Sequence, residues 1–174
     1  MDVSDARRFR WPPWVFSQSR RVSLSHGHVC LDGGKLRRWR IVRGLSVDAL
    51  AALTGGRVPA RQLYEYEAGR RRCDPARFAA LCRVLGVTGP QLSAVPLELA
   101  GLAEWRHWAG LTADQAAERL GMSSWSLLRV ERTGRLPRQV TREGFLAAAA
   151  GLYACSPGQA RAALARTSHP RQTY

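Results

Sequence analysis

One phrase that the chain contains twice limits its possible folds more than any other feature. The stretch RIVRGLSVDAL, residues 40–50, returns as RHWAGLTADQA at residues 106–116. Arginine, glycine, leucine, a hydroxyl residue and aspartate occupy the same places in both stretches. A chain of 174 residues can form one ordinary domain or two small ones. The repeat therefore predicts two copies of one folding unit.

Within each copy, the pattern predicts short amphipathic helices separated by glycine turns. Gly44 is expected to end a helix as a left-handed cap, and Ser46 to cap the next helix. Gly110 and Thr112 repeat this arrangement in the second copy. A further helix is expected to begin near Pro59, a residue that a first helical turn tolerates. No segment has convincing strand character, so the predicted fold class is all-α.

The charge of the chain favours a polyanionic partner. The chain has 27 Lys and Arg residues against 13 Asp and Glu residues, a net charge of +14, and Lys35 is the only lysine. Arginine suits bidentate contacts with phosphate or guanine better than lysine does. The largest excess lies in residues 31–95, with 12 basic against 5 acidic side chains. A merely solvated, arginine-rich surface is the alternative interpretation.

The order of helices and turns resembles a known family. The stretch LRRWRIVRGLSVDALAALTGGRVPARQLYEYEAGRR is similar to the Cro-and-phage-repressor (XRE) helix-turn-helix family, and LAEWRHWAGLTADQAAERLGMSSWSLLRVERTGR resembles a second copy. The resemblance implies two tandem five-helix, lambda-repressor-like domains, in each of which the third helix enters the major groove of DNA. We expect these helix-turn-helix domains at residues 31–95 and 96–166, followed by a polar tail at 167–174.

Residues 1–30 differ from both copies. They combine Trp, Pro, Arg and Ser without helical periodicity, which predicts a flexible basic arm. We expect Arg7, Arg8 and Arg10 to touch the backbone or the minor groove when DNA is bound.

The resemblance also implies one structural ion pair in each copy. In the family, an arginine late in the first helix pairs with a glutamate late in the third. Arg40 and Glu67 match these positions in the first copy, and Arg106 and Glu131 match them in the second. Recurrence of the pair in both copies favours a structural clasp over unrelated surface charges.

Counting back from Glu67 gives the residues of the first recognition helix that are expected to face outward. They are Ala60, Arg61, Gln62, Tyr64 and Glu65. Arg61 can read guanine, Gln62 can read adenine, and Glu65 can accept from cytosine or orient Arg61. The turn before this helix, GGRV, makes the first copy two residues longer than the second and places Arg57 near a phosphate. The longer turn leaves Gln62 and Arg57 as alternative readers.

The second recognition helix is expected to present a different set of side chains. They are Ser123, Ser124, Trp125, Ser126 and Arg129. Trp125 can pack on a thymine methyl group, and an exposed tryptophan is also a common anchor in protein interfaces. Contact with DNA is favoured for this copy, with a role in assembly as the alternative.

Phosphate contacts are expected on both sides of the recognition helices. The helices that begin at Ser46 and Thr112 offer backbone N–H groups to phosphate. Arginines follow each recognition helix: Arg70, Arg71 and Arg72 in the first copy, and Arg132, Arg135 and Arg138 in the second. A solvated turn is the alternative for the first cluster.

Together these patterns predict a sequence-specific regulator of transcription that binds double-stranded DNA in a bacterial cytoplasm, at the nucleoid. A homodimer and contact with RNA polymerase are left open as further partners. Two other interpretations remain: a protein-interaction module of the antitoxin type, and a DNA-maintenance protein of a plasmid, phage or chromosome end. The first would suit an acidic or apolar surface better than this basic one.

The sequence argues against an enzyme and against bound cofactors. The four histidines, His26, His28, His107 and His169, have no partnering nucleophile or carboxylate constellation. His26, His28 and Cys30 lie close together, but no second cluster completes a metal site. We therefore expect no metal and no cofactor. The four cysteines lack C-x-x-C spacing and are expected to be reduced, and no apolar run reaches the roughly 18 residues that span a bilayer.

Overall fold

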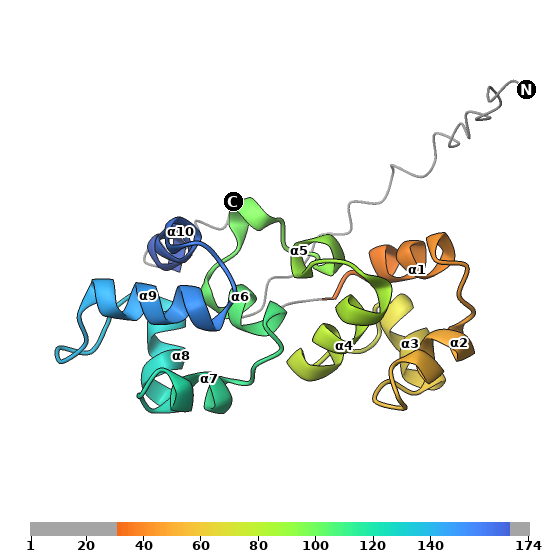
Figure 1. Cartoon of the computed structure of the whole chain (residues 1–174), viewed down its shortest axis with the longest axis horizontal. Coiled ribbons are helices and arrows are strands. Elements are labelled where there is room, and N and C mark those ends of the chain that lie inside the picture. Colours follow the sequence, from red (N-terminus) through yellow and green to blue (C-terminus); the bar gives the residue numbers. More distant parts are fainter. Residues whose placement is uncertain (1–30, 168–174) are drawn as a thin grey trace, which may run out of the picture.

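The computed structural model describes residues 31–167, and this part of the chain is helical with no strand. The first unit contains α1 (Gly33–Val42), α2 (Val47–Leu53), α3 (Ala60–Glu67), α4 (Pro75–Leu85) and α5 (Gly89–Leu92). After a single 3-10 turn, η2 (Leu97–Leu99), the second unit contains α6 (Leu102–Trp108), α7 (Ala113–Arg119), α8 (Ser124–Thr133), α9 (Arg142–Leu152) and α10 (Pro157–Thr167). The two units lie next to each other along the long axis of the molecule (Figure 1).

The all-α fold with two tandem helix-turn-helix units is therefore confirmed for the described residues. The predictions for the basic arm, including Arg7, Arg8 and Arg10, lie outside them, as does the cluster of His26, His28 and Cys30. Of the tail predicted at 167–174, Thr167 is instead the last residue of α10, and residues 168–174 lie outside the described part.

Short polar side chains begin most of the helices where the sequence predicted caps. Ser46 Oγ accepts a hydrogen bond from the Ala49 N–H at 3.0 Å, and Thr112 Oγ1 accepts one from the Gln115 N–H at 3.2 Å. Each satisfies a backbone donor that the first helical turn leaves unpaired. Pro59 departs slightly from expectation, because it is the extended residue before α3 and not part of its first turn.

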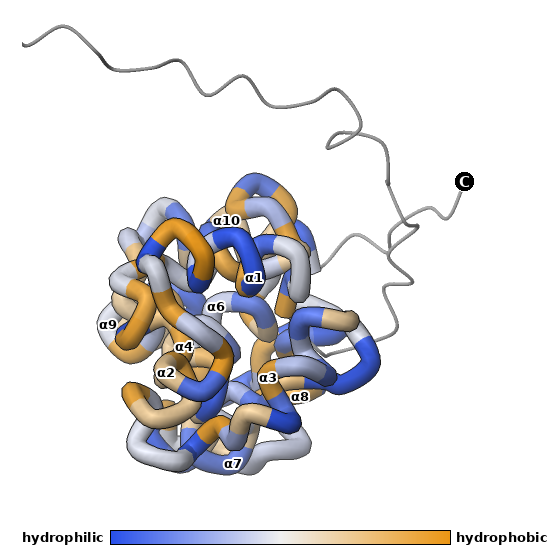
Figure 2. The backbone as a smooth tube through the Cα atoms, turned by 90° about the vertical axis from the view of Figure 1, so that its right-hand side faces the viewer, coloured by the Kyte–Doolittle hydropathy of each residue, from blue (hydrophilic) through white to orange (hydrophobic). Residues whose placement is uncertain are grey.

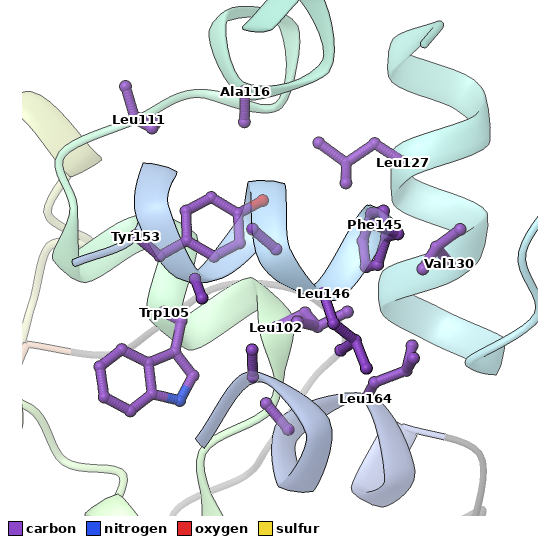
Figure 3. Packing of buried hydrophobic residues seen from close by; sticks show 14 of the residues in the cluster. Leu102, Trp105, Leu111, Ala116, Leu127, Val130, Phe145, Leu146, Tyr153 and Leu164 are labelled. Atoms are coloured by element: carbon purple, nitrogen blue, oxygen red, sulfur yellow. The ribbon is translucent and has the colours of Figure 1, made fainter. Parts of the chain in front are cut away.

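Each unit has its own hydrophobic core. In the first unit, the inward faces of α1 to α4 meet at fully buried residues, among them Leu36, Leu50, Leu63, Tyr66 and Phe78. In the second unit, Leu127 and Val130 of α8 face Phe145 and Leu146 of α9 (Figure 3). In each core the third helix of the unit, α3 or α8, contributes two buried apolar side chains, so its inner face is fixed by packing.

The three described cysteines, Cys73, Cys82 and Cys155, have free thiols. Cys73 and Cys82 are buried in the first core. Burial disfavours the charged thiolate and raises the pKa of each of the two thiols to about 12. Both therefore stay protonated near neutral pH and act as small apolar core residues.

The end of α9 differs from the end of α4 at one position. Gly86 caps α4 with a left-handed φ of 64°, and Ala154 takes the same role after α9 with a φ of 51°. A left-handed alanine costs roughly 1–2 kcal/mol, and glycine removes this strain at the cost of greater freedom in the unfolded chain.

We therefore expect Ala154→Gly to raise the free energy of unfolding by about 0.5–1 kcal/mol, measured by urea denaturation. Ala148→Gly, an exposed position inside α9, is the control. That control should lose about 1 kcal/mol, because glycine is a poor helix former. Destabilisation by both variants would contradict the strain at Ala154.

Candidate nucleic-acid interface

Two helix-turn-helix motifs, α2–α3 and α7–α8, form matching parts of the two units. In both views α3 and α8 lie at the same level, in the lower half of the molecule (Figures 1 and 2). Their buried residues face the cores, and their opposite faces are open to solvent. Both candidate recognition helices thus lie in the same half of the molecule.

A charge pair fixes the first of these helices. Arg40 Nε donates to Glu67 Oε1 at 2.6 Å, and Arg40 Nη2 donates to Glu67 Oε2 at 2.9 Å. Arg40 Nη1 also donates to the Leu45 carbonyl at 2.9 Å. The hydrogen bond with Glu67 is the main reason that the pKa of Arg40 is raised. One guanidinium therefore ties α1 to the end of α3 and to the turn before α2.

The second unit contains the same arrangement in a more buried form. Arg106 Nε and Nη2 donate to the Glu131 carboxylate at 2.6 and 3.0 Å, and Nη1 donates to the Leu111 carbonyl at 3.0 Å. Only 8% of the Arg106 side chain and 5% of the Glu131 side chain are exposed. Burial alone would lower the pKa of Arg106, but the hydrogen bonds and charge of Glu131 outweigh it and raise the pKa. Both expected ion pairs are present.

The solvent face of α3 is dominated by Arg61. Its side chain is 91% exposed, and its Nε lies 3.5 Å from the carboxylate of Glu65 one turn later. Glu65 also accepts from Arg71 Nη1 at 3.1 Å. Tyr64 is 60% exposed beside this pair. Arg61 is held only by a solvated ion pair, so it can exchange Glu65 for another acceptor at little cost.

Three residues of this helix are less accessible than expected, and one of them is Glu65, whose side chain is 27% exposed. Ala60 is half-buried and packs against the first core. Gln62 is half-buried, and its Oε1 lies 3.5 Å from the Tyr66 hydroxyl. The outward face of α3 is therefore narrower than the sequence indicated, and Arg61 and Tyr64 form its centre with the half-buried Glu65 beside them.

The solvent face of α8 is aromatic. Trp125 is 68% exposed, and the Arg129 guanidinium lies 5.5 Å from the centre of its ring. Such a spacing allows a cation–π contact. The hydroxyl of Ser124 donates to the Asp114 carboxylate of α7, and Ser123 caps α8 by accepting from the Ser126 N–H at 3.2 Å. Ser123 and Ser124 therefore have structural partners, while Trp125 and Arg129 face solvent.

The two helices place their exposed side chains in the same register. Arg61 is the second residue of α3, and Trp125 is the second residue of α8. Each contacts the side chain four residues later, Glu65 in one case and Arg129 in the other. The same register makes Leu128, which is 48% exposed, the counterpart of Tyr64. The prediction omitted Leu128, although the count back from Glu131 would have found it.

The longer turn of the first unit is a fixed loop. Six residues, 54–59, connect α2 to α3, whereas four residues, 120–123, connect α7 to α8. Val58 is fully buried, and its N–H donates to the Thr54 hydroxyl at 3.1 Å. The Arg57 carbonyl accepts from Arg77 Nε at 3.0 Å, while the Arg57 side chain is exposed. The two extra residues therefore bulge outward and leave the start of α3 in register with α8.

The arginines that were expected to meet phosphate lie near the ends of α3 and α8. Arg70, Arg71 and Arg72 follow α3 and are exposed. In the second unit, Arg132, Arg135 and Arg138 are likewise exposed. Arg135 and Arg138 line a surface hollow together with Trp125, Ser126 and Arg129. A basic rim thus borders each candidate reading face.

The two helix starts that were expected to face phosphate differ in one detail. Ser46 and Thr112 are both exposed. The Thr112 N–H, however, donates to Gln115 Oε1 at 3.0 Å as part of a capping box. This side chain occupies one donor that a phosphate would otherwise reach.

The residues from 31 to 167 contain no group of three His, Cys, Asp or Glu side chains placed to hold a metal. No helix in the same range has the length and apolar character needed to cross a membrane.

Comparison with known proteins identifies the class that the fold and the paired motifs define. A family model described as a helix-turn-helix domain matches residues 33–95 and, separately, residues 100–164. The chain belongs to the helix-turn-helix domain family, and it contains two copies of the domain. No curated protein matches the chain.

Among solved structures, the chain is similar to an HTH_3 family transcriptional regulator from Vibrio cholerae. The two are 30% identical over 32% of this chain and 30% of that one, with a TM-score of 0.30. The chain therefore spans less than a third of that regulator.

Proposed function

We propose that the protein is a transcriptional regulator that binds specific double-stranded DNA sequences with both α3 and α8. Helix-turn-helix units bind DNA by laying their second helix in the major groove. The observation that carries the proposal is the repeated geometry. In each unit a largely buried ion pair fixes the third helix, whose second residue is largely exposed and is bordered by arginines.

The two helices would read DNA with different chemistry. Arg61 can make a bidentate contact with the O6 and N7 atoms of guanine, with Glu65 orienting its guanidinium. Trp125 can pack on a thymine methyl group while Arg129 contacts guanine or phosphate. The arginines after each helix would hold the phosphates and would contribute affinity without sequence preference.

A second role for α8 is supported by one observation. Trp125 and Leu128 are exposed on the same helix, at 68% and 48%. Such a pair also suits a protein partner, which could be a second copy of the chain or RNA polymerase. A DNA-maintenance protein would use the same contacts and would differ only in where its sites lie.

The first test separates a reader of bases from a holder of phosphates. Arg61→Ala is expected to cost about 1–3 kcal/mol on the preferred site and to relax discrimination at one or two base pairs. Arg70→Ala is expected to weaken all sequences about equally and to lower the slope of log K against log salt by about one. Titrations of specific and scrambled duplexes at several salt concentrations measure both effects.

Arg161→Ala is the matched control, because Arg161 is exposed on α10, away from the level of α3 and α8 (Figure 1). It removes the same charge and should change neither discrimination nor the salt slope by a comparable amount. Equal weakening of both duplexes by Arg61→Ala would show that Arg61 holds phosphate, and Gln62 or Arg57 would become the candidate reader.

A further inference from the structure

The contact between the two units is formed by different helices on each side. α4 and α5 of the first unit pack against α6 of the second (Figure 1). The rings of Phe78 and His107 meet edge to face, with centroids 5.0 Å apart. Trp108 packs directly on Gly89, where a Cβ would lie 2.4 Å from its ring. We call this contact the junction.

The internal repeat shows that α1 does not make the contact that its counterpart α6 makes in the junction. Aligning Arg40 with Arg106 places Ile41 and Val42 of α1 at the positions of His107 and Trp108 in α6. His107 is buried in the junction, whereas Ile41 and Val42 are 58% and 63% exposed. If a two-fold axis related the units, α1 would pack on α9 as α6 packs on α4.

A second pair of positions gives the same result. Gly110, at the end of α6, lies so close to α4 that an added Cβ would meet the Ala79 Cβ at 2.8 Å. At the equivalent Gly44, an added Cβ would meet nothing within 4 Å. The junction is therefore a head-to-tail contact, and no two-fold axis relates the two helix-turn-helix motifs.

This asymmetry bears on the DNA that the chain can bind. In dimeric helix-turn-helix proteins, the palindromic symmetry of the site mirrors the two-fold axis of the protein. Here α3 and α8 lie at the same level of one chain (Figures 1 and 2), but they are not related by such an axis and carry different side chains. Arg61 and Glu65 stand in α3 where Trp125 and Arg129 stand in α8.

We propose that one chain binds a composite, non-palindromic site in double-stranded DNA, in which two different half-sites have a fixed order, orientation and spacing. The proposal rests on the function proposed above, since it requires that both α3 and α8 read bases. The junction sets the spacing between α3 and α8, and so between the two half-sites, because it packs α4 and α5 directly on α6.

The experiment begins with selection of bound duplexes from a random pool by the full chain. The expected motif differs from its own reverse complement, and one chain binds each duplex in analytical ultracentrifugation. Selection is then repeated with Arg61→Ala and with Trp125→Ala. Each variant should relax the motif in a different half, since the two residues occupy the same position in different units.

Three duplexes then test orientation and spacing: the selected site, the site with one half inverted in place, and the site with roughly 5 base pairs, about half a helical turn, inserted between the halves. Inversion misplaces several base contacts, so it should weaken binding by about 100-fold or more. The insertion turns one half-site to the far side of the duplex and should have a similar effect.

Several results would overturn the proposal. A motif equal to its own reverse complement, bound by two chains, would show that two copies create a two-fold axis and would leave sequence-specific binding intact. Relaxation of the same half by both variants, or no effect of Trp125→Ala, would show that the second unit does not read bases. Failure to select any motif would remove the proposed function itself.

Discussion

Replacing Glu131 with Gln is expected to lower the free energy of unfolding by about 3–5 kcal/mol, the largest effect of any single change to a charged group in the described chain. Arg106 would then remain buried and charged beside a neutral amide. The amide oxygen can accept one hydrogen bond and the Leu111 carbonyl keeps its own, but no negative charge is left to balance the guanidinium. Guanidinium groups do not lose their proton in proteins, so the uncompensated charge cannot be relieved by deprotonation. Urea denaturation of the full chain measures the loss.

Glu67→Gln, the equivalent change in the first unit, should lower the free energy of unfolding by a smaller amount. The Arg40 and Glu67 side chains are 13% and 10% exposed, against 8% and 5% for Arg106 and Glu131. Water can therefore compensate Arg40 more easily, and Glu67→Gln should cost less than Glu131→Gln. Glu118→Gln, on the exposed side of α7, is the control and should stay within about 0.5 kcal/mol of the parent.

A double variant separates loss of the pair from loss of one partner. Arg106→Met combined with Glu131→Leu removes both charges and should be less destabilising than Glu131→Gln alone, because no buried charge is left unpaired. If the double variant loses as much stability as Arg106→Met and Glu131→Leu lose separately when added together, the two residues act independently. That outcome would contradict the clasp.

The elements that the sequence predicted well are those fixed by local chemistry. Ser46 and Thr112 cap helices because their hydroxyls reach backbone donors three residues later. Gly44 and Gly110 adopt the left-handed conformation that ends a helix. The ion pairs could be predicted because the family resemblance named them and the repeat supplied a second instance of each.

The junction could not be predicted in the same way. Periodicity shows which face of a helix is apolar, but it does not say which other helix covers that face. Trp108 and Val42 occupy the same position of the repeat, yet one packs on Gly89 and the other is exposed. The burial of Ala60 could not be predicted for the same reason. Counting back from Glu67 places Ala60 on the outer face of α3, but the first core also covers that position.

The second large effect is expected at the junction, where the repeat supplies a matched pair of glycines. Gly110 and Gly44 have φ values of 77° and 66°, so alanine is strained in the backbone at both positions. The strain costs roughly 1–2 kcal/mol in each case. Only at Gly110 would the new methyl group also meet α4, with the Ala79 Cβ 2.8 Å away. Overpacking of this kind adds about 1–3 kcal/mol, so Gly110→Ala should be clearly more destabilising than Gly44→Ala.

A compensating change in α4 shows whether the added loss comes from the junction. Ala79→Gly removes the methyl group that Gly110→Ala would strike, at a cost of about 1 kcal/mol for glycine in a helix. In the double variant the clash is gone, so its loss should be smaller than the sum of the two single losses. Measuring the DNA affinity of the same variants tests whether the junction sets the spacing of α3 and α8. Gly110→Ala should weaken binding to the composite site by more than Gly44→Ala does. Adding Ala79→Gly to Gly110→Ala should restore part of that affinity. Strict additivity in both measurements would mean that the methyl groups never meet and that the spacing of α3 and α8 does not depend on this contact.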